Sequence, residues 1–253
     1  MLGLQVVSMF KAKVKAEVIK EVINVVSTLV DEVKLKITKD KVTLKAVDPA
    51  HVAMVDLELK SSAFDEYSAT DCELGLDIDK LKDVLKVSKP GDVVSLTHDD
   101  GKNMLIVQLQ NITRKMSLVD TAGMTDPKVP NLNLPVKVVI KTSELLQGIK
   151  SAESISDHVA LVASPTEFEM ICEGDTDSMS LRLPKDMLES LEAGSTVRSL
   201  FSLEYFGNMI KSIGSTEKVL LKLASDYPVM MEYNIANNEG HVKYLLAPRI
   251  ENE

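Results

Sequence analysis

Short segments in which apolar and polar residues alternate make up most of this chain. Residues 33–37 read VKLKI, and a turn at Lys39 and Asp40 separates them from a second alternating segment at 42–46. Strict alternation is typical of an antiparallel strand with one covered face. The pattern predicts strands at 33–37, 42–46, 55–59, 105–109, 136–140, 168–172, 179–183, 219–223 and 242–246.

Four other segments carry apolar residues at helical spacing. They predict helices over residues 16–29, 79–88, 143–152 and 203–212. Asp79 and Ser143 are the predicted N-caps of the second and third helices, because short polar side chains accept hydrogen bonds from the first amides of a helix.

The order of these elements repeats along the chain. Helices are expected near residues 16 and 143, and again near 79 and 203, which gives offsets of 127 and 124 residues. An offset close to half of the 253 residues predicts two copies of one unit. The predicted fold class is α+β, with two similar β-rich domains of two helices each, at 1–120 and 136–253. A connector at 121–135, containing Gly123 and three prolines, separates them.

Composition narrows the function classes. The chain has 29 Lys and Arg residues against 38 Asp and Glu, a formal charge of −9, which argues against a protein coated in nucleic acid. This net charge is still compatible with nucleic-acid binding that is confined to one basic surface. With ten aromatic residues and no Trp, base-stacking platforms are not expected. No apolar run of membrane-spanning length is present, and residues 1–8 lack a basic stretch followed by a long apolar one. We therefore expect no secretory signal and no membrane partner.

Motifs of catalysis are absent from the sequence. It has no GxxxxGK[ST], HExxH or GxSxG pattern, and its four histidines lack metal-ligand spacing. Cys72 and Cys172 favour free thiols in a reducing compartment, with a disulfide as the alternative. We therefore expect a binding or assembly protein, not an enzyme, with no metal and no cofactor. The alternatives are a hydrolase or transferase with its site between the two halves, and a monomeric or dimeric peptide-binding scaffold.

Opposite its apolar stripe, each predicted helix carries lysine among short polar side chains. These residues are Lys20, Asn24 and Ser27; Lys82, Lys86 and Lys89; Gln147, Lys150, Ser151 and Ser154; and Asn208, Lys211, Ser212 and Ser215. Such a face can contact a phosphate backbone without reading bases. A solvated helix surface is the alternative for any one helix.

Three stretches resemble the proliferating cell nuclear antigen family of DNA sliding clamps. They are MFKA at 9–12, KAVDPAHVAMV at 45–55, and the C-terminal EYNI at 232–235 with GHVKYLLAPRIE at 240–251. The resemblance implies the DNA clamp fold and a closed ring of three subunits around double-stranded DNA. It implies a homotrimer, with a heterotrimer of related chains as the alternative. It also implies a processivity factor in DNA replication and DNA repair, cytoplasmic in an archaeon and nuclear in a eukaryote.

The resemblance also assigns residues. Lys20, Lys86, Lys150 and Lys211 fall at family positions that face DNA, and helical spacing adds Lys82 and Lys89. Partners such as DNA polymerase, the clamp loader, flap endonuclease and DNA ligase would insert short peptides into an outer pocket. That pocket would be formed by Val47, His51, Met54, Val129, Pro130, Tyr227, Pro228, Ala247, Pro248 and Arg249. Subunits would join through residues 108–116 of one protomer and 174–182 of the next.

Two stretches depart from the family pattern. Residues 1–8 form an atypical extension before the usual start at Met9, and they reflect either an upstream start codon or an added strand. The connector around residues 121–126 is unlike that of many relatives, and it is expected to affect the choice of partner.

Overall fold

The computed structural model describes residues 9–214 and 217–249, so the expectations for residues 1–8 and for Ser215 lie outside the described residues. The chain divides into two compact units. The first contains Met1–Pro49, Val55–Pro127 and Asn234–Val242, and the second contains Ala50–Met54, Lys128–Tyr233 and Lys243–Glu253. None of the helices within the described ranges is long and apolar enough to span a membrane.

The first unit is built from two antiparallel sheets and a pair of helices. One sheet has the order β5-β1-β7-β8-β9 and the other includes the run β4-β3-β2-β6. The strands are β1 (Phe10–Lys15), β2 (Glu32–Ile37), β3 (Lys41–Val47), β4 (Ala53–Lys60), β5 (Glu66–Ala69), β6 (Cys72–Asp77), β7 (Val93–Asp99), β8 (Met104–Leu109) and β9 (Ile112–Ser117). The helices α1 (Ala16–Val26) and α2 (Ile78–Leu85) pack against each other.

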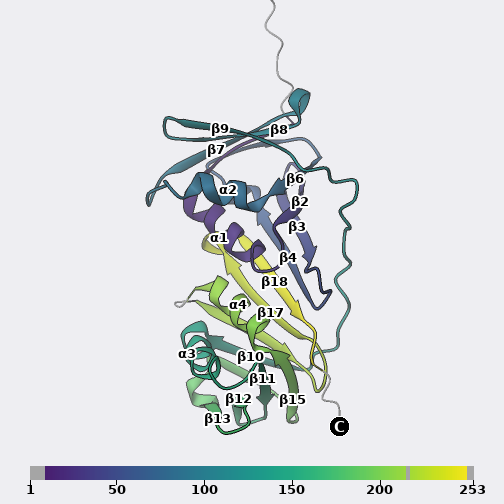
Figure 1. Ribbon diagram of the computed structural model, residues 1–253, viewed down its shortest axis with the longest axis vertical. Helices are drawn as coiled ribbons and strands as arrows, with labels where there is room; N and C mark the ends of the chain where they lie inside the picture. Colours follow the sequence, from purple (N-terminus) through teal and green to yellow (C-terminus); the bar gives the residue numbers. More distant parts are fainter. Residues whose placement is uncertain (1–8, 215–216, 250–253) are drawn as a thin grey trace, which may run out of the picture. The chain divides into compact units, whose positions relative to one another are not determined.

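The second unit repeats this plan. Its sheets contain the runs β14-β10-β16-β17 and β13-β12-β11-β15, which match β5-β1-β7-β8 and β4-β3-β2-β6 strand for strand. The strands are β10 (Val136–Lys141), β11 (His158–Ala163), β12 (Glu167–Glu173), β13 (Ser178–Pro184), β14 (Ser190–Glu192), β15 (Val197–Ser202), β16 (Lys218–Leu223) and β17 (Val229–Ile235), and the chain continues into β18 (Gly240–Leu246). Helices α3 (Thr142–Ala152) and α4 (Leu203–Ile213) form its pair (Figure 1).

The hydrogen bonds at the helix starts recur in the same way. The first amide of α1, at Ala16, donates to the carbonyl of Asp92, and the first amide of α3, at Thr142, donates to that of Glu217. The first amides of α2 and α4 bond in the same manner to the carbonyls of Asp31 and Asp157. Each donor or acceptor in the first unit lies 125 or 126 residues before the equivalent residue in the second unit. The predicted duplication of one α+β unit is therefore confirmed.

Helix packing follows the predicted apolar stripes. Phe206, Met209 and Ile210 of α4 are fully buried, and Leu145 and Ile149 of α3 are buried to the same degree. Burying such a side chain stabilises the fold by about 1.5–3 kcal/mol. Gly148 allows α3 to approach the sheet, because a Cβ there would lie 2.3 Å from the Cε of Met170.

The predicted N-caps are wrong in both helices. Asp77, not Asp79, precedes α2, and its carboxylate accepts a hydrogen bond from the Lys80 amide at 3.0 Å. This bond holds the pKa of Asp77 below its ordinary value. In α3 the helix begins one residue before Ser143, and Lys141 occupies the N-cap position without a side-chain bond.

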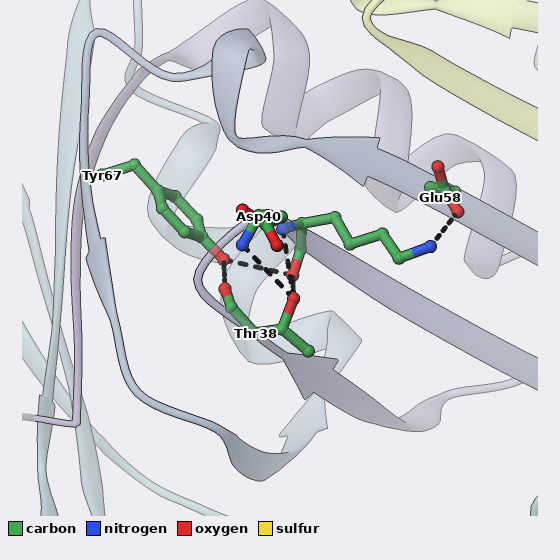
Figure 2. A network of polar contacts seen from close by, with 5 residues as sticks. Thr38, Asp40, Glu58 and Tyr67 are labelled. Carbon is green, nitrogen blue, oxygen red and sulfur yellow. Dashed lines mark hydrogen bonds and ion pairs between the residues drawn. The ribbon is translucent and has the colours of Figure 1, made fainter.

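A tyrosine fastens the β2–β3 turn in the first unit. The Tyr67 hydroxyl donates to the carbonyl oxygens of Thr38, at 2.6 Å, and Lys41, at 3.2 Å (Figure 2). Burial raises the pKa of Tyr67 to about 12. Lys41, whose carbonyl accepts from Tyr67, also forms an ion pair: its Nζ lies 2.7 Å from a carboxylate oxygen of Glu58 on β4.

Candidate nucleic-acid and peptide interfaces

The predicted DNA-facing lysines lie on the two helix pairs. In the first unit, Lys20 lies on α1, Lys82 on α2, Lys86 at the C-cap of α2, and Lys89 three residues further on. Lys20 is half-buried and the other three are exposed. In the second unit, Lys150 on α3 and Lys211 on α4 are both exposed.

These lysines differ in their acidic neighbours. The ammonium nitrogen of Lys86 lies 2.6 Å from an oxygen of Asp83, and that of Lys211 lies 2.7 Å from an oxygen of Glu153. Hydrogen bonding within the first pair raises the pKa of Lys86 and lowers that of Asp83. In the described part of the chain, the other four predicted lysines form no ion pair. Those four are Lys20, Lys82, Lys89 and Lys150.

Ser212, predicted to lie on the polar face of α4, points inward instead. Its hydroxyl donates to the carbonyl of Met209 at 2.7 Å and lies 3.0 Å from the hydroxyl of Tyr244. It therefore fastens α4 to the underlying strand and is removed from the exposed lysine face.

The C-terminal tail, residues 247–249, is bonded to two other segments of the second unit. The amide of Ala247 donates to the carbonyl of Val52 at 2.8 Å, and the amide of Arg249 donates to that of Leu200 at 2.7 Å. Ala247 and Pro248 are half-buried, whereas Arg249 and His51 are exposed. His51 has φ +57°, a left-handed conformation that turns the chain just before Val52.

The turn at residues 226–228 is held beside the same strand. The Tyr227 amide donates to Ser199 Oγ at 3.2 Å, and the Asp226 amide donates to the carbonyl of Arg198 at 3.0 Å. Strand β15 therefore carries both this turn and the tail. Tyr227 is 44% exposed, which is unusual for a large apolar ring and leaves it available to a partner.

The remaining predicted peptide-site residues vary in exposure. Met54 is only 7% exposed and belongs mainly to the core. Pro228 and Val129 are half-buried, and Pro130 is exposed. Val47 is half-buried at the end of β3 in the first unit.

Three residues that hold this region were missed by the sequence analysis. Val52 and Leu200 act through carbonyl oxygens, and no side-chain pattern indicates a backbone acceptor. Ser199 is 1% exposed, and its hydroxyl also donates to the carbonyl of Ala224. Val52 itself is 36% exposed, and that exposure is visible only in the structure.

The start of the connector and the segment just before it are fastened to strands of the first unit. Val119 forms an antiparallel bridge with Gly75 on β6, its amide donating to the Gly75 carbonyl at 2.9 Å. Further along, Lys36 Nζ lies 2.5 Å from Asp126, and Lys34 Nζ donates to the carbonyl of Met124. The bond from Lys36 holds the pKa of Asp126 below its ordinary value. The connector thereby covers the edge of β6, which would otherwise expose unpaired backbone groups.

The two segments predicted to join subunits are not single strands. Residues 108–116 contain the end of β8, a turn with Gln110 at φ +52°, and most of β9. Residues 174–182 begin in a loop and enter β13 at Ser178. In their sheets, β9 and β13 each lie at an end of the strand order, as do β5, β6, β14 and β15 in the described part of the chain.

Taken together, these features define a class of protein: a duplicated α+β chain whose units each pair two lysine-bearing helices with antiparallel sheets. Residues 9–125 match the family described as proliferating cell nuclear antigen, N-terminal domain, and residues 128–249 match its C-terminal domain. The chain belongs to the proliferating cell nuclear antigen family.

Curated relatives and solved structures agree with this assignment. The chain is 45% identical to a DNA polymerase sliding clamp of Methanocella arvoryzae and 42% identical to one of Methanosarcina acetivorans. Each alignment covers 97% of this chain and all of the relative. Among solved structures, that of A. fulgidus PCNA with the C-terminal region of FEN-1 bound matches with a TM-score of 0.91 and 30% identity. That match covers 97% of this chain and all of the other.

Proposed function

We propose that this chain is a DNA polymerase sliding clamp. In this role it encircles double-stranded DNA without reading its sequence and tethers replication and repair enzymes. The observation that carries the proposal is the full-length similarity to relatives of that name, at up to 45% identity. The proposed role is topological, so it requires no catalysis, metal or cofactor. The proposed location is the cytoplasm, with the chromosome.

Contact with DNA is assigned to the helix lysines. Lys20, Lys150 and Lys211 supply one cation each on α1, α3 and α4, and Lys86 supplies one at the C-cap of α2; Lys82 on α2 and Lys89 just after it add two more. Ammonium groups on flexible stems attract phosphates and do not distinguish bases, so the contact is non-specific and weakens with salt. Confining these cations to the helices reconciles DNA binding with a net charge of −9.

Partner binding is assigned to the tail region of the second unit, with Val47 and the connector residues Val129 and Pro130 as further contributors. The FEN-1 segment bound to the A. fulgidus relative supports a peptide mode of binding. The exposed Tyr227 ring and the half-buried Pro228 and Pro248 offer apolar contacts for a peptide anchor. The proposed partners are DNA polymerase, the clamp loader, flap endonuclease and DNA ligase.

Self-assembly into a closed homotrimer is proposed through the edge strands β9 and β13. Pairing one edge with the other would satisfy backbone groups that each monomer leaves exposed. A heterotrimer of related chains is the alternative assembly. Light scattering on the purified chain tests self-assembly. A homotrimer would have three times the 27.8 kDa mass of one chain, and a species of 27.8 kDa would contradict self-assembly.

Encirclement is tested by loading the clamp on nicked circular DNA and on the same DNA after linearisation. A ring stays on the circle and slides off the linear molecule; equal retention on both would contradict the proposal. Replacing Lys20, Lys86, Lys150 and Lys211 with Ala should reduce retention and its dependence on salt. The matched control replaces four exposed or partly exposed lysines off the α-helices, Lys39, Lys102, Lys137 and Lys185, and should retain DNA as the parent does.

A further inference from the structure

A polar cavity of about 530 Å³ lies beside the C-terminal tail in the second unit. Its walls come from the end of α3, the loop that leads into β11, the first turns of α4, and the tail residue Arg249. Arg249 is thus shared between this cavity and the proposed peptide site. Because the Arg249 amide is bonded to the Leu200 carbonyl, the tail is fixed at the cavity wall.

The charges of the cavity do not cancel. Glu153 is already neutralised by Lys211 at 2.7 Å. Asp157 and Glu204 remain, and within the described ranges neither carboxylate has an ion-pair partner. Against these two negative charges stands the single guanidinium of Arg249. The cavity therefore carries an excess of negative charge that a cationic group would neutralise.

A buried hydroxyl also opens into the cavity. Ser202 is 8% exposed, lines the cavity and precedes α4, yet its side chain makes no capping bond. No described residue serves as its hydrogen-bond partner. The Ser202 hydroxyl lines the cavity without a side-chain partner in the described residues, so its oxygen can accept a hydrogen bond from a ligand there.

We propose that this cavity binds a lysine or arginine side chain from the segment that flanks a partner's anchoring peptide. Asp157 and Glu204 neutralise its charge, and Ser202 accepts one of its hydrogen bonds. A flank running beside the tail from the anchor reaches the cavity at Arg249. No three His, Cys, Asp or Glu side chains of the described residues converge as a metal site would require, and this favours a side chain over a bare ion. The inference rests on the proposed tethering function and names a specificity determinant for it.

The test compares three fluorescent peptides based on the C-terminal region of a flap endonuclease. All three peptides contain the same anchoring sequence and differ only in the flanking segment, which is basic, neutral or acidic. Each flanking segment is tested at the N-terminal end of the anchor and, separately, at its C-terminal end. The binding variants are the double variant Asp157→Asn with Glu204→Gln, and Ser202→Ala. Asp186→Asn, which removes an exposed acid elsewhere in the second unit, is the matched control.

We expect the parent protein to bind the basic-flank peptide about two- to five-fold more tightly than the neutral one per ion pair formed. The double variant should lose this advantage and keep its affinity for the neutral peptide. Ser202→Ala should lose part of it, and Asp186→Asn none. The advantage should also shrink as salt is added, because the pairs are partly exposed.

Other outcomes overturn the inference in distinguishable ways. If the neutral peptide binds but the parent shows no preference for the basic flank, the cavity assignment fails and the tethering proposal stands. The assignment fails likewise if the acidic flank is preferred, or if the double variant weakens all three peptides equally. If no peptide binds the parent at all, the proposed tethering site itself fails, and the inference fails with it.

Discussion

Replacing Gly75 with alanine should detach from β6 the segment that leads into the connector. A Cβ built at Gly75 lies 2.2 Å from the carbonyl oxygen of Val119 and 2.9 Å from its carbonyl carbon. Both atoms belong to backbone, so rotation of a side chain cannot relieve the clash. Either β6 or the connector must move, and the bridge between Val119 and Gly75 is lost.

The size of the effect follows from three contributions. Overpacking of this kind costs about 1–3 kcal/mol. Losing the hydrogen bond from the Val119 amide to the Gly75 carbonyl adds about 0.5–1.5 kcal/mol. Alanine restricts the unfolded chain more than glycine does, which returns about 0.4–1 kcal/mol. The free energy of unfolding of the first unit should therefore fall by about 0.5–4 kcal/mol.

Urea titration followed by far-ultraviolet circular dichroism measures this change. The matched control is Gly123→Ala in the connector, where a new Cβ has no atom within 4 Å. This control should leave the midpoint unchanged or raise it slightly. Hydrogen exchange at the Val119 amide locates the effect, since that amide loses its acceptor. Equal midpoints for Gly75→Ala and Gly123→Ala, with Val119 equally protected, would refute the reasoning.

Three further predictions address the core, a titrating tyrosine and the connector. Phe168→Ala empties a fully buried site in the second unit and should lower its free energy of unfolding by about 3–5 kcal/mol in the same urea assay. The pKa of Tyr67 is about 12 in the folded chain against an ordinary 10. The stability contributed by the neutral phenol is therefore complete below pH 10 and is lost as pH rises towards 12. In unfolding curves taken across this range, Tyr67→Phe should lose less stability than the parent protein. The pKa of Asp126 is lowered by Lys36, so the stability from this pair is present above the carboxyl's ordinary pKa and is lost as pH falls through the lowered value. Asp126→Asn should therefore lower the protection factor of the Val119 amide at neutral pH and abolish its further loss in acid.

Regular alternation made many strands predictable, and its absence explains two that were missed, although β1 alternates and was missed as well. Residues 33–37 and 42–46 alternate and form β2 and β3. Strand β11 reads HVALVA, with consecutive apolar residues, because Val159, Ala160 and Leu161 are all buried. Strand β9 reads ITRKMS, with four exposed residues in succession, so no buried face marks it.

The candidate sites were predictable to different degrees for a physical reason. Lysines on one face of a helix can be predicted from their spacing in the sequence, because side chains three and four residues apart share a face. The tail region depends instead on contacts between residues far apart in sequence, such as the bond between the Arg249 amide and the Leu200 carbonyl. Backbone acceptors carry no residue-type signal, so only the folded chain reveals which carbonyl holds the tail.

The pattern of paired and unpaired lysines is the same in both units. This pattern is relevant to how a clamp can hold DNA and still move along it. In each unit the first helix carries an unpaired family lysine, Lys20 or Lys150, within the described residues. The second helix carries a paired one, Lys86 with Asp83 or Lys211 with Glu153. A paired ammonium must give up a charge-assisted hydrogen bond before it contacts a phosphate, so its net gain is smaller. Glu153 reaches Lys211 from the loop after α3, and spacing along α4 alone gives no sign of it. Half of the proposed DNA-contacting lysines are thus restrained by their own chain, which would favour loose phosphate contacts in the proposed sliding role.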